Sequence, residues 1–388
     1  MTGIFLVAAE ASGDAIGADV IDELVRIAPD IRLQGVGGAA MARRGVQSDI
    51  DMSGLAVLGL IDGLKAYGRV KKAVVATADV IMTANPDAVV LIDSWGFMWR
   101  LARELKLRGS SARLIKLVGP QVWATRPGRA RVLAKWTDHL ICIHPFEPPF
   151  YEPWGLPTTV MGNPAIGRME KGDGERARRK FGLPDATQAI GLLPGSRRSE
   201  LKRVAPTLAA ACNRLCEAHS NLHVVCPVAP SVRDEIRAMA KTWTFPHTLV
   251  EDETDKADAM AAMTVAIACS GTVTTELAEQ GAAVVTGYKL GWVTWTLARA
   301  FLMRTKFISL VNIAANAEVI PEFVQTRLSV ARIAATVETL LNDPDKRALQ
   351  ISAQFKGLES MAAEKEPAPL VAARAILSET GKAGRPAS

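Results

Sequence analysis

Long hydrophobic runs are missing from this chain. Although 49% of its 388 residues are hydrophobic, no stretch reaches 18 consecutive apolar residues, the length that indicates a membrane-spanning helix. The first residues also lack the basic region and the small-residue cleavage site of a signal peptide. We therefore expect a globular, cytoplasmic protein that spans no membrane.

Cysteine is scarce. The five cysteines are odd in number and scattered, with no Cys-x-x-Cys pair and no nearby His-x-x-x-His. This pattern indicates neither a disulfide framework nor a zinc site. We expect the cysteines to be small buried hydrophobic residues.

Acidic residues are absent from one basic stretch and nearly absent from another. The formal net charge is +6, with four basic residues and no acid between Lys65 and Lys72. Between Arg100 and Lys135 there are ten basic residues against Glu104 alone. Such stretches attract nucleic acid, an anionic membrane or a phosphorylated substrate, although ordinary solvated helix faces are the alternative.

Short apolar runs alternate with amphipathic segments along most of the chain, which predicts an α/β fold with parallel sheets. The charged, glycine-containing segment 168–185 divides two such series and is predicted to be a linker. We therefore predict a Rossmann-like domain at 1–167, a second one at 186–343, and a helical segment at 344–388. In doubly wound sheets, ligands bind just past the carboxyl ends of the strands.

Two loops of the second half have the composition of a phosphate site. Leu-Pro-Gly-Ser-Arg at 193–197 follows a predicted strand, with Glu200 three residues later. Its glycine lets backbone N–H groups approach an anion, and Arg197 offers a bidentate guanidinium. The second loop, Ser270-Gly271-Thr272, opens a predicted helix and suits a diphosphate, with Glu276 placed to hold ribose hydroxyls. Helix capping and a helix-dipole partner are the alternative interpretations.

Carboxylates end two predicted strands of the first half. Glu-Ala-Ser-Gly-Asp at 10–14 follows the first strand, and Asp93 ends the strand at 88–93. A carboxylate facing a cleft can act as the general base that deprotonates a hydroxyl nucleophile. Glu10 and Asp93 are the candidates, and Ser12 is a candidate substrate ligand. Asp14 and Asp93 could instead cap the helices that follow them. Gly-Val-Gly-Gly at 35–38 is only part of a dinucleotide fingerprint, which argues against an NAD-dependent oxidoreductase.

An apolar stretch at 55–64 leads directly into the first basic cluster. An apolar stripe edged with Lys and Arg is typical of a helix that lies in a membrane interface, with core packing as the alternative. The predicted membrane-binding residues are Leu60, Ile61, Leu64, Lys65, Arg69, Lys71 and Lys72.

A set of motifs in the same order along residues 4–380 resembles the lipid-A-disaccharide synthase family. The motifs are Glu-Ala-Ser-Gly-Asp (10–14), Gly-Val-Gly-Gly-x-x-Met (35–41), Leu-Ala-Val-Leu-Gly (55–59), Pro-Gln-Val-Trp-Ala (120–124), Leu-Pro-Gly-Ser-Arg-x-x-Glu (193–200), Ser-Gly-Thr (270–272) with Glu276, Tyr288-Lys289, Ser309-Leu310 with Asn312, and Val-Ile-Pro-Glu (319–322) with Gln325.

The resemblance implies a GT-B glycosyltransferase, in which two Rossmann-like domains enclose the active site and a C-terminal segment returns to the first domain. It implies metal-independent, inverting transfer of 2,3-diacylglucosamine from its UDP derivative to 2,3-diacylglucosamine 1-phosphate, with no metal and no cofactor. Implied partners are these substrates, an anionic inner-membrane surface on its cytoplasmic face and a second copy of the chain, without nucleic acid. The implied site residues are catalytic Asp93, the cleft carboxylate Glu10, and the substrate or UDP ligands Ser12, Arg197, Glu200, Ser270, Gly271, Thr272, Glu276, Asn312, Glu322 and Gln325.

Four positions depart from the family's motifs. They are Gly96, Thr125, Asn163 and Ala317, where the family has Asp, Trp, His and Arg. These departures leave two alternatives open. One is a related UDP-sugar glycosyltransferase with another lipid acceptor, and the other is a catalytically silent protein that binds nucleotide or lipid.

Overall fold

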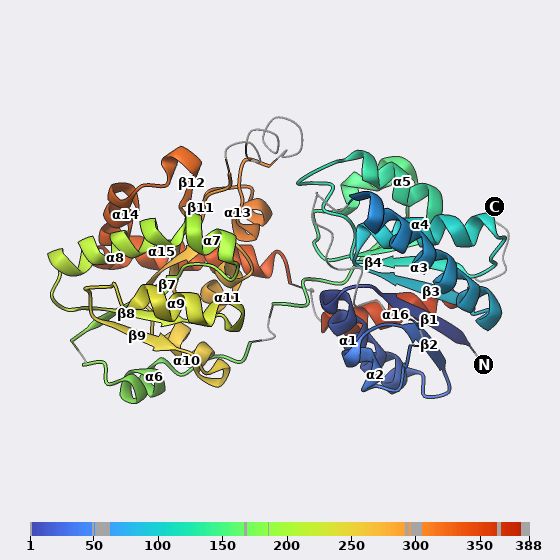
Figure 1. Ribbon diagram of the computed structural model, residues 1–388, viewed down its shortest axis with the longest axis horizontal. Coiled ribbons are helices and arrows are strands. Elements are labelled where there is room, and N and C mark those ends of the chain that lie inside the picture. Colours follow the sequence, from blue (N-terminus) through green and yellow to red (C-terminus); the bar gives the residue numbers. More distant parts are fainter. Residues whose placement is uncertain are drawn as a thin grey trace. The chain divides into compact units, whose positions relative to one another are not determined.

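The computed structural model describes residues 2–48, 50, 63–166, 169–184, 186–291, 295, 305–362 and 366–381. The chain forms two compact units. Unit 1 comprises Met1–Pro164 and Ala362–Ser388, and unit 2 comprises Ala165–Met361. Each unit contains one six-stranded sheet covered by helices (Figure 1).

The sheet of unit 1 is wholly parallel and has the strand order β2-β1-β3-β4-β5-β6. Its strands are β1 (Gly3–Ala8), β2 (Arg32–Val36), β3 (Ala88–Ile92), β4 (Arg113–Leu117), β5 (His139–Cys142) and β6 (Thr158–Val160). Its helices are α1 (Ala11–Ile27), α2 (Ala39–Ala42), α3 (Gly63–Ala84), α4 (Trp95–Leu107), α5 (Gly128–Trp136) and α16 (Ala368–Thr380). The strand order reverses between β1 and β3, so their carboxyl ends form the switch point where ligands bind in such sheets.

Both faces of this sheet are buried. Along β1, Ile4 and Leu6 pack in the core that includes α1 and α16, whereas Phe5 and Val7 pack in the core that includes α3 and α4. Successive side chains of a strand point to opposite faces, so an unbroken apolar run is what a strand covered on both sides requires. This explains why the inner strands β1 and β3 are continuous apolar runs.

Unit 2 repeats the architecture with the parallel order β12-β11-β10-β7-β8-β9. Its strands are β7 (Gln188–Leu193), β8 (Leu222–Pro227), β9 (His247–Val250), β10 (Val265–Cys269), β11 (Ala283–Tyr288) and β12 (Glu322–Val324). Its helices are α6 (Gly174–Phe181), α7 (Arg198–Arg203), α8 (Ala205–Ala218), α9 (Arg233–Ala240), α10 (Lys256–Ala261), α11 (Val273–Glu279), α13 (Leu310–Ala315), α14 (Val330–Asn342) and α15 (Pro344–Glu359). Here the order reverses between β7 and β10.

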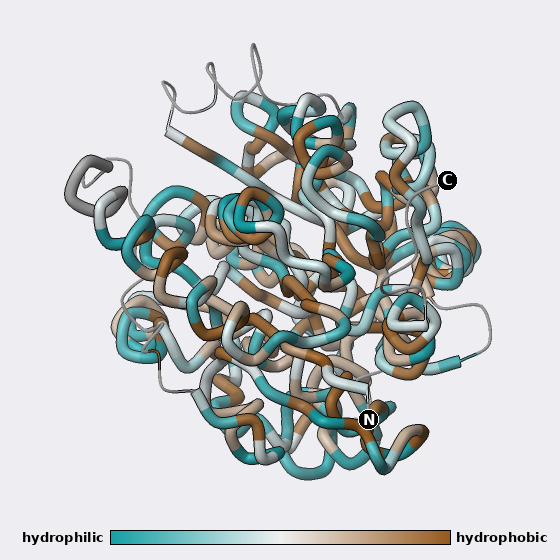
Figure 2. Tube along the Cα trace, turned by 90° about the vertical axis from the view of Figure 1, so that its right-hand side faces the viewer, coloured by the Kyte–Doolittle hydropathy of each residue, from teal (hydrophilic) through white to brown (hydrophobic). Residues whose placement is uncertain are grey.

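The covering helices bury one face each. In α14 the buried residues Ile333, Val337 and Leu341 recur at helical spacing, and the Ser329 hydroxyl accepts from the Arg332 N–H to cap the first turn. Figure 2 shows the same alternation of hydrophobic and hydrophilic residues along other helices. The five cysteines are unpaired, and all but Cys216 are buried, as the sequence predicts.

The predicted linker at 168–185 contains part of unit 2. Within it, α6 packs against α10, and the Asp258 carboxylate accepts from the Arg176 guanidinium and, at 2.8 Å, from the Asp173 N–H. A Cβ at Gly172 would meet the Ala257 carbonyl oxygen at 2.1 Å, so only glycine fits this close approach. The high charge of the segment reflects ion pairs with α10, which sequence alone does not distinguish from a solvated linker.

The C-terminal segment at 344–388 is divided between the units. In α15, the Gln354 side chain bonds to the main chain of Val284 and Ala282, at 3.0 and 2.8 Å, so this helix belongs to unit 2. In unit 1, α16 is tied to β4 by Arg113 and the buried Glu379, with 2.5 Å between Nη2 and Oε2. The return to the first unit therefore begins after Met361.

Candidate active site

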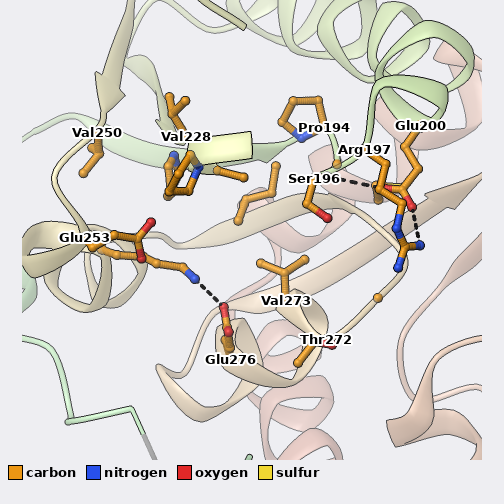
Figure 3. Close-up of a pocket in the computed structure, with 18 of the residues that line it drawn as sticks. Pro194, Ser196, Arg197, Glu200, Val228, Val250, Glu253, Thr272, Val273 and Glu276 are labelled. Carbon is orange, nitrogen blue, oxygen red and sulfur yellow. Dashed lines mark hydrogen bonds and ion pairs between the residues drawn. The ribbon is translucent and has the colours of Figure 1, made fainter. Parts of the chain in front are cut away.

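A pocket of about 450 Å³ lies at the switch point of unit 2, past the ends of β7, β8 and β10. Six of the residues predicted to bind the substrate or UDP line this pocket, which we call the unit 2 pocket (Figure 3). They are Arg197, Glu200, Ser270, Gly271, Thr272 and Glu276. Parallel strands end at the same edge of a sheet, so loops from distant parts of the sequence meet there.

The loop after β7 is stabilised by the carboxylate of Glu200, which lies in the following helix α7. Glu200 accepts from the Ser196 N–H at 3.1 Å and from Arg197 Nη1 at 3.1 Å. Gly195 has a φ of +124°, and a Cβ there would meet Glu200 Cβ at 2.8 Å, so glycine is required. The Arg197 side chain is 77% exposed. Its guanidinium can therefore turn to a bound anion at little cost.

The loop after β10 presents small residues to the pocket. A Cβ at Gly271 would meet nothing within 4 Å, which leaves room for a ligand beside the main chain. The Ser270 N–H donates to the Gly287 carbonyl at 3.2 Å, so this N–H is already used. The Thr274 hydroxyl donates to Gly271 O at 2.8 Å and closes the first turn of α11.

Residues that sequence reasoning missed complete the unit 2 pocket. Val228 and Pro230 follow β8, while Glu253 and Lys256 follow β9. Lys256 forms an ion pair with Glu276, with 2.9 Å between Nζ and Oε2 (Figure 3). The signal available in the sequence was the short strand at 247–250, because a strand there places the next loop at the same edge of the sheet.

Three predicted donor-site residues, Asn312, Glu322 and Gln325, do not line this pocket. Asn312 is fully buried, donates to Ile320 O and Glu322, and accepts from two backbone N–H groups. Glu322 also accepts from the N–H groups of residues 308 and 309, and Gln325 bonds both main-chain groups of Leu290. In this structure they stabilise loops next to β12.

In unit 1, Asp93 stands at the end of β3, at the switch point beside β1. Ser12, in the first turn of α1, donates from its hydroxyl to Asp93 Oδ2 at 2.8 Å. The structure thus brings together two predicted site residues that lie far apart in the sequence. Asp93 has a φ of +51°, in the left-handed region that non-glycine residues rarely adopt. Such conformations are concentrated at functional sites.

A second pocket, of about 270 Å³, opens past the ends of β3, β4 and β5. The chemically active residues that line this unit 1 pocket are Asp93, Lys116, Trp123, Arg129, His144 and Glu147. The buried Trp123 Nε1 and His144 Nδ1 have no hydrogen-bond partner among the described residues. A buried donor without a partner is costly, so the pocket is suited to a ligand that supplies acceptors.

Burial perturbs the ionisation of this pocket. It raises the pKa of Glu147 to about 7 and lowers that of His144 to about 4. Glu147 accepts from the His144 N–H at 2.9 Å, which opposes the rise. Burial also lowers the pKa of Arg129, which stacks on Trp95 at 5.2 Å from the ring centre. Perturbed carboxyl groups in a pocket are typical of functional sites.

The other acids of the 10–14 motif have different positions. Glu10 is exposed and precedes α1 without capping it through its side chain. The buried Asp14 instead caps α2, accepting from the N–H groups of Gly38, Ala40 and Met41 at 2.8, 2.8 and 3.1 Å. A Cβ at Gly38 would lie 2.6 Å from Asp14 Oδ2, so the glycine pair at 37–38 serves this contact.

Comparison with known proteins identifies the family. A family model described as Lipid-A-disaccharide synthetase matches residues 4–375. The lipid-A-disaccharide synthase of Rhodospirillum centenum is 40% identical over 351 residues, covering 90% of this chain and 87% of that protein. The chain belongs to this family. A second relative, the lipid-A-disaccharide synthase of Bradyrhizobium diazoefficiens, is 34% identical over 388 residues and covers 98% of this chain and 97% of its own length.

Solved structures show the fold. Staphylococcus aureus MnaA, solved with UDP, matches with a TM-score of 0.63 at 13% identity, covering 98% of this chain and 96% of that one. Acinetobacter baumannii MurG matches with a TM-score of 0.60 at 15% identity, covering 97% and 100%. Together with the two parallel sheets, these matches confirm the predicted GT-B fold.

The described residues contain neither a cluster of metal ligands nor a membrane-spanning helix. No cluster of three or more His, Cys, Asp or Glu in the described ranges could hold a metal ion. Within the same ranges, no helix combines the length and hydropathy needed to cross a membrane. The predicted membrane residues Leu60 and Ile61 lie outside the described residues, as do the side chains of Leu64 and Lys65, whereas Arg69, Lys71 and Lys72 are exposed on α3.

Proposed function

We propose that this chain transfers 2,3-diacylglucosamine from its UDP derivative to 2,3-diacylglucosamine 1-phosphate, releasing UDP and the lipid A disaccharide. Family membership over nearly the whole chain supports this activity. The observation that carries it is that each unit has a pocket past the strand ends near its switch point. The unit 2 pocket contains a cationic, phosphate-type loop, and the unit 1 pocket contains Asp93.

The unit 2 pocket is proposed to hold UDP. Arg197 would contact the diphosphate, and Lys256 would add a second positive charge. Ser270, Gly271 and Thr272 would lie beside the phosphates, where their small side chains leave room. Glu276 would accept from the ribose hydroxyls. This arrangement neutralises the leaving group with side-chain cations, so we propose a metal-independent reaction.

Asp93 is the proposed general base, positioned by the Ser12 hydroxyl. The hydroxyl oxygen of the acceptor attacks the anomeric carbon, the bond from that carbon to the UDP oxygen breaks, and the proton passes to the Asp93 carboxylate. Attack on the face opposite to UDP inverts the anomeric centre. Glu10 is the alternative base, since it follows β1 at the same switch point.

The unit 1 pocket is proposed to hold the acceptor. Arg129 and the Trp123 N–H, which has no partner in the described part of the chain, are suited to a phosphate. Asp93 is suited to the nucleophilic hydroxyl. Of the four departures from the family motifs, Thr125 lines this pocket and Gly96 lies in the first turn of α4. These positions favour, as a second candidate, the same UDP-sugar chemistry with another lipid acceptor.

The exposed Arg69, Lys71 and Lys72 support binding to an anionic membrane. We propose a peripheral protein on the cytoplasmic face of the inner membrane, active alone or as a homodimer.

Release of UDP tests the function. Purified protein is incubated with the two family substrates, and then with the same donor and a panel of other lipid acceptors. Release with 2,3-diacylglucosamine 1-phosphate, but not with the others, supports the proposal. Release only with another acceptor favours the second candidate, and binding of UDP without any release would indicate a silent protein.

A further inference from the structure

Lys116 is a buried lysine in the middle of a sheet. It lies in β4, between β3 and β5, and is 1% exposed. Its Nζ donates to the carbonyl oxygens of Leu91 at 3.1 Å, Asp93 at 2.6 Å and Leu117 at 3.0 Å. An ammonium has three N–H donors, whereas a neutral amine has two. The three acceptors therefore match the protonated form.

These bonds converge on the main chain of Asp93. The Asp93 N–H donates to Leu117 O at 2.9 Å, the same oxygen that accepts from Lys116. The Asp93 carbonyl accepts from Lys116 directly. Asp93 and Ser94 have φ values of +51° and +32°, two consecutive left-handed residues that are not glycine. Such a conformation persists only where the surrounding structure holds it.

We propose that Lys116 is a positioning residue for the transfer reaction, because its ammonium holds the left-handed turn that presents the Asp93 carboxylate to the unit 1 pocket. This inference rests on the proposed function, in which Asp93 is the base. All three donors of Lys116 are engaged by the main chain, so Lys116 acts through Asp93 and contacts no substrate.

The position also makes the turn sensitive to pH. Burial lowers the pKa of Lys116 to about 7, while the Asp93 and Glu10 carboxylates oppose this change. As the pH rises, Lys116 loses a proton. Its amine then has one N–H donor fewer for the three carbonyl oxygens, and the positive charge beside the carboxyl end of β4 is lost. The rate of UDP release is therefore expected to fall above neutral pH.

Other ionisable groups face the same pocket. Glu147 and His144 follow β5, and Arg129 lies in α5. Burial raises the pKa of Glu147 to about 7 and lowers that of His144 to about 4. Glu147 therefore titrates in the same range as Lys116, which makes Glu147→Gln the necessary control.

The first test compares pH profiles of UDP release for the wild type, Lys116→Met and Glu147→Gln. Lys116→Met keeps a similar length without the charge. It is expected to lower kcat by roughly 10²-fold, as misplacement of a catalytic group does, with KM for the UDP-sugar unchanged and the alkaline decline abolished. The alkaline decline is expected to persist in Glu147→Gln. A normal kcat with an unchanged decline in Lys116→Met, or loss of the decline only in Glu147→Gln, overturns the proposal.

The second test does not depend on activity. Hydrogen exchange of the peptide at 92–98 is measured in the wild type from pH 6 to 9 and corrected for intrinsic rates. Protection should fall as Lys116 loses its proton, and it should be low at every pH in Lys116→Met. Constant protection in the wild type overturns the positioning role even if the variant does not fold. Absence of UDP release by the wild type would instead refute the proposed function. The hydrogen-exchange result would then decide by itself whether Lys116 holds the turn at Asp93.

Discussion

Lys256 and Glu276 face each other in the unit 2 pocket, with 2.9 Å between their charged atoms (Figure 3). Lys256 begins α10 and Glu276 lies in α11, so the pair joins two elements at the edge of the pocket. Their side chains are 26% and 25% exposed. A partly exposed ion pair contributes little stability, so a ligand with a diphosphate and ribose hydroxyls can replace it.

The role of Glu276 is tested with two ligands. If its carboxylate accepts from the ribose, Glu276→Ala, which removes both acceptor oxygens, should weaken UDP binding roughly tenfold, the scale of a hydrogen bond to a charged group. The wild type should prefer UDP to 2′-deoxy-UDP, and the variant should bind both about equally, as measured by calorimetry. A preference that is the same in both proteins would show that Glu276 does not contact the 2′-hydroxyl.

Arg197→Ala should weaken UDP binding by roughly tenfold or more, because a charge-assisted bond to phosphate is worth about 1.5–3 kcal/mol. The neighbouring Arg198→Ala is a matched control, since Arg198 does not line the pocket and its guanidinium is paired with Glu235 at 2.5 Å. Calorimetry of the two variants separates local charge from a specific contact. Equal losses in both would remove Arg197 from the ligand list.

Asp93→Asn should lower turnover by roughly 10²–10⁴-fold, the usual range for general-base catalysis, and should leave UDP affinity near normal because the two pockets are in different units. The Ser12 hydroxyl can still donate to the amide oxygen, so the turn is retained. Steady-state UDP release is measured beside that of Glu10→Gln. A large loss only in Glu10→Gln would transfer the role of base to Glu10, and chelator is expected to change neither rate.

Replacing Arg69, Lys71 and Lys72 by alanine should weaken binding to anionic vesicles, since each basic residue near such a surface contributes about 1 kcal/mol. Salt should weaken wild-type binding in the same way. Co-sedimentation with anionic and neutral vesicles measures both effects. The exposed residues Arg332, Lys346 and Lys356 of unit 2 provide a control triple variant. Equal binding to the two vesicle types would contradict the electrostatic part of the proposal.

Replacing Leu60, Ile61 and Leu64 by serine tests the apolar part of the proposal, and should lower vesicle binding further.

Glu147 should make stability depend on pH. Its pKa is raised from 4.5 to about 7 by burial, so between these values the folded protein keeps a proton that the unfolded chain has released. The contribution of Glu147 to stability therefore falls as pH rises through this window. Glu147→Gln lacks this titration and can still accept from the His144 N–H, so its advantage in urea unfolding should grow from pH 4.5 to 7. A constant difference would contradict the assignment.

Much of the fold could be predicted because buried parallel strands are unbroken apolar runs. The loops at 193–197 and 270–272 follow such runs, so their convergence in one pocket followed from sheet geometry. The direction in which a side chain points could not be predicted in this way. Asn312 and Glu322 are residue types that often bind ligands, but in this structure their side chains accept from main-chain N–H groups close by in the sequence. Lys116 was equally hidden, because a single lysine in an apolar strand does not reveal which carbonyls it reaches.

The division of unit 1 into two stretches of chain affects how the protein is made. A ribosome produces the first stretch, then all of unit 2, and only afterwards α16, whose buried face fills one side of the unit 1 sheet. Until then the sheet face beside α1 lacks part of its cover, and Arg113 lacks its partner Glu379. Unit 2 can thus be fully synthesised while unit 1 still lacks α16. Apolar surface that is exposed during that interval favours aggregation. Asp93 and Lys116 both belong to unit 1. The proposed base and the lysine that positions it therefore reach their final surroundings only when the end of the chain leaves the ribosome.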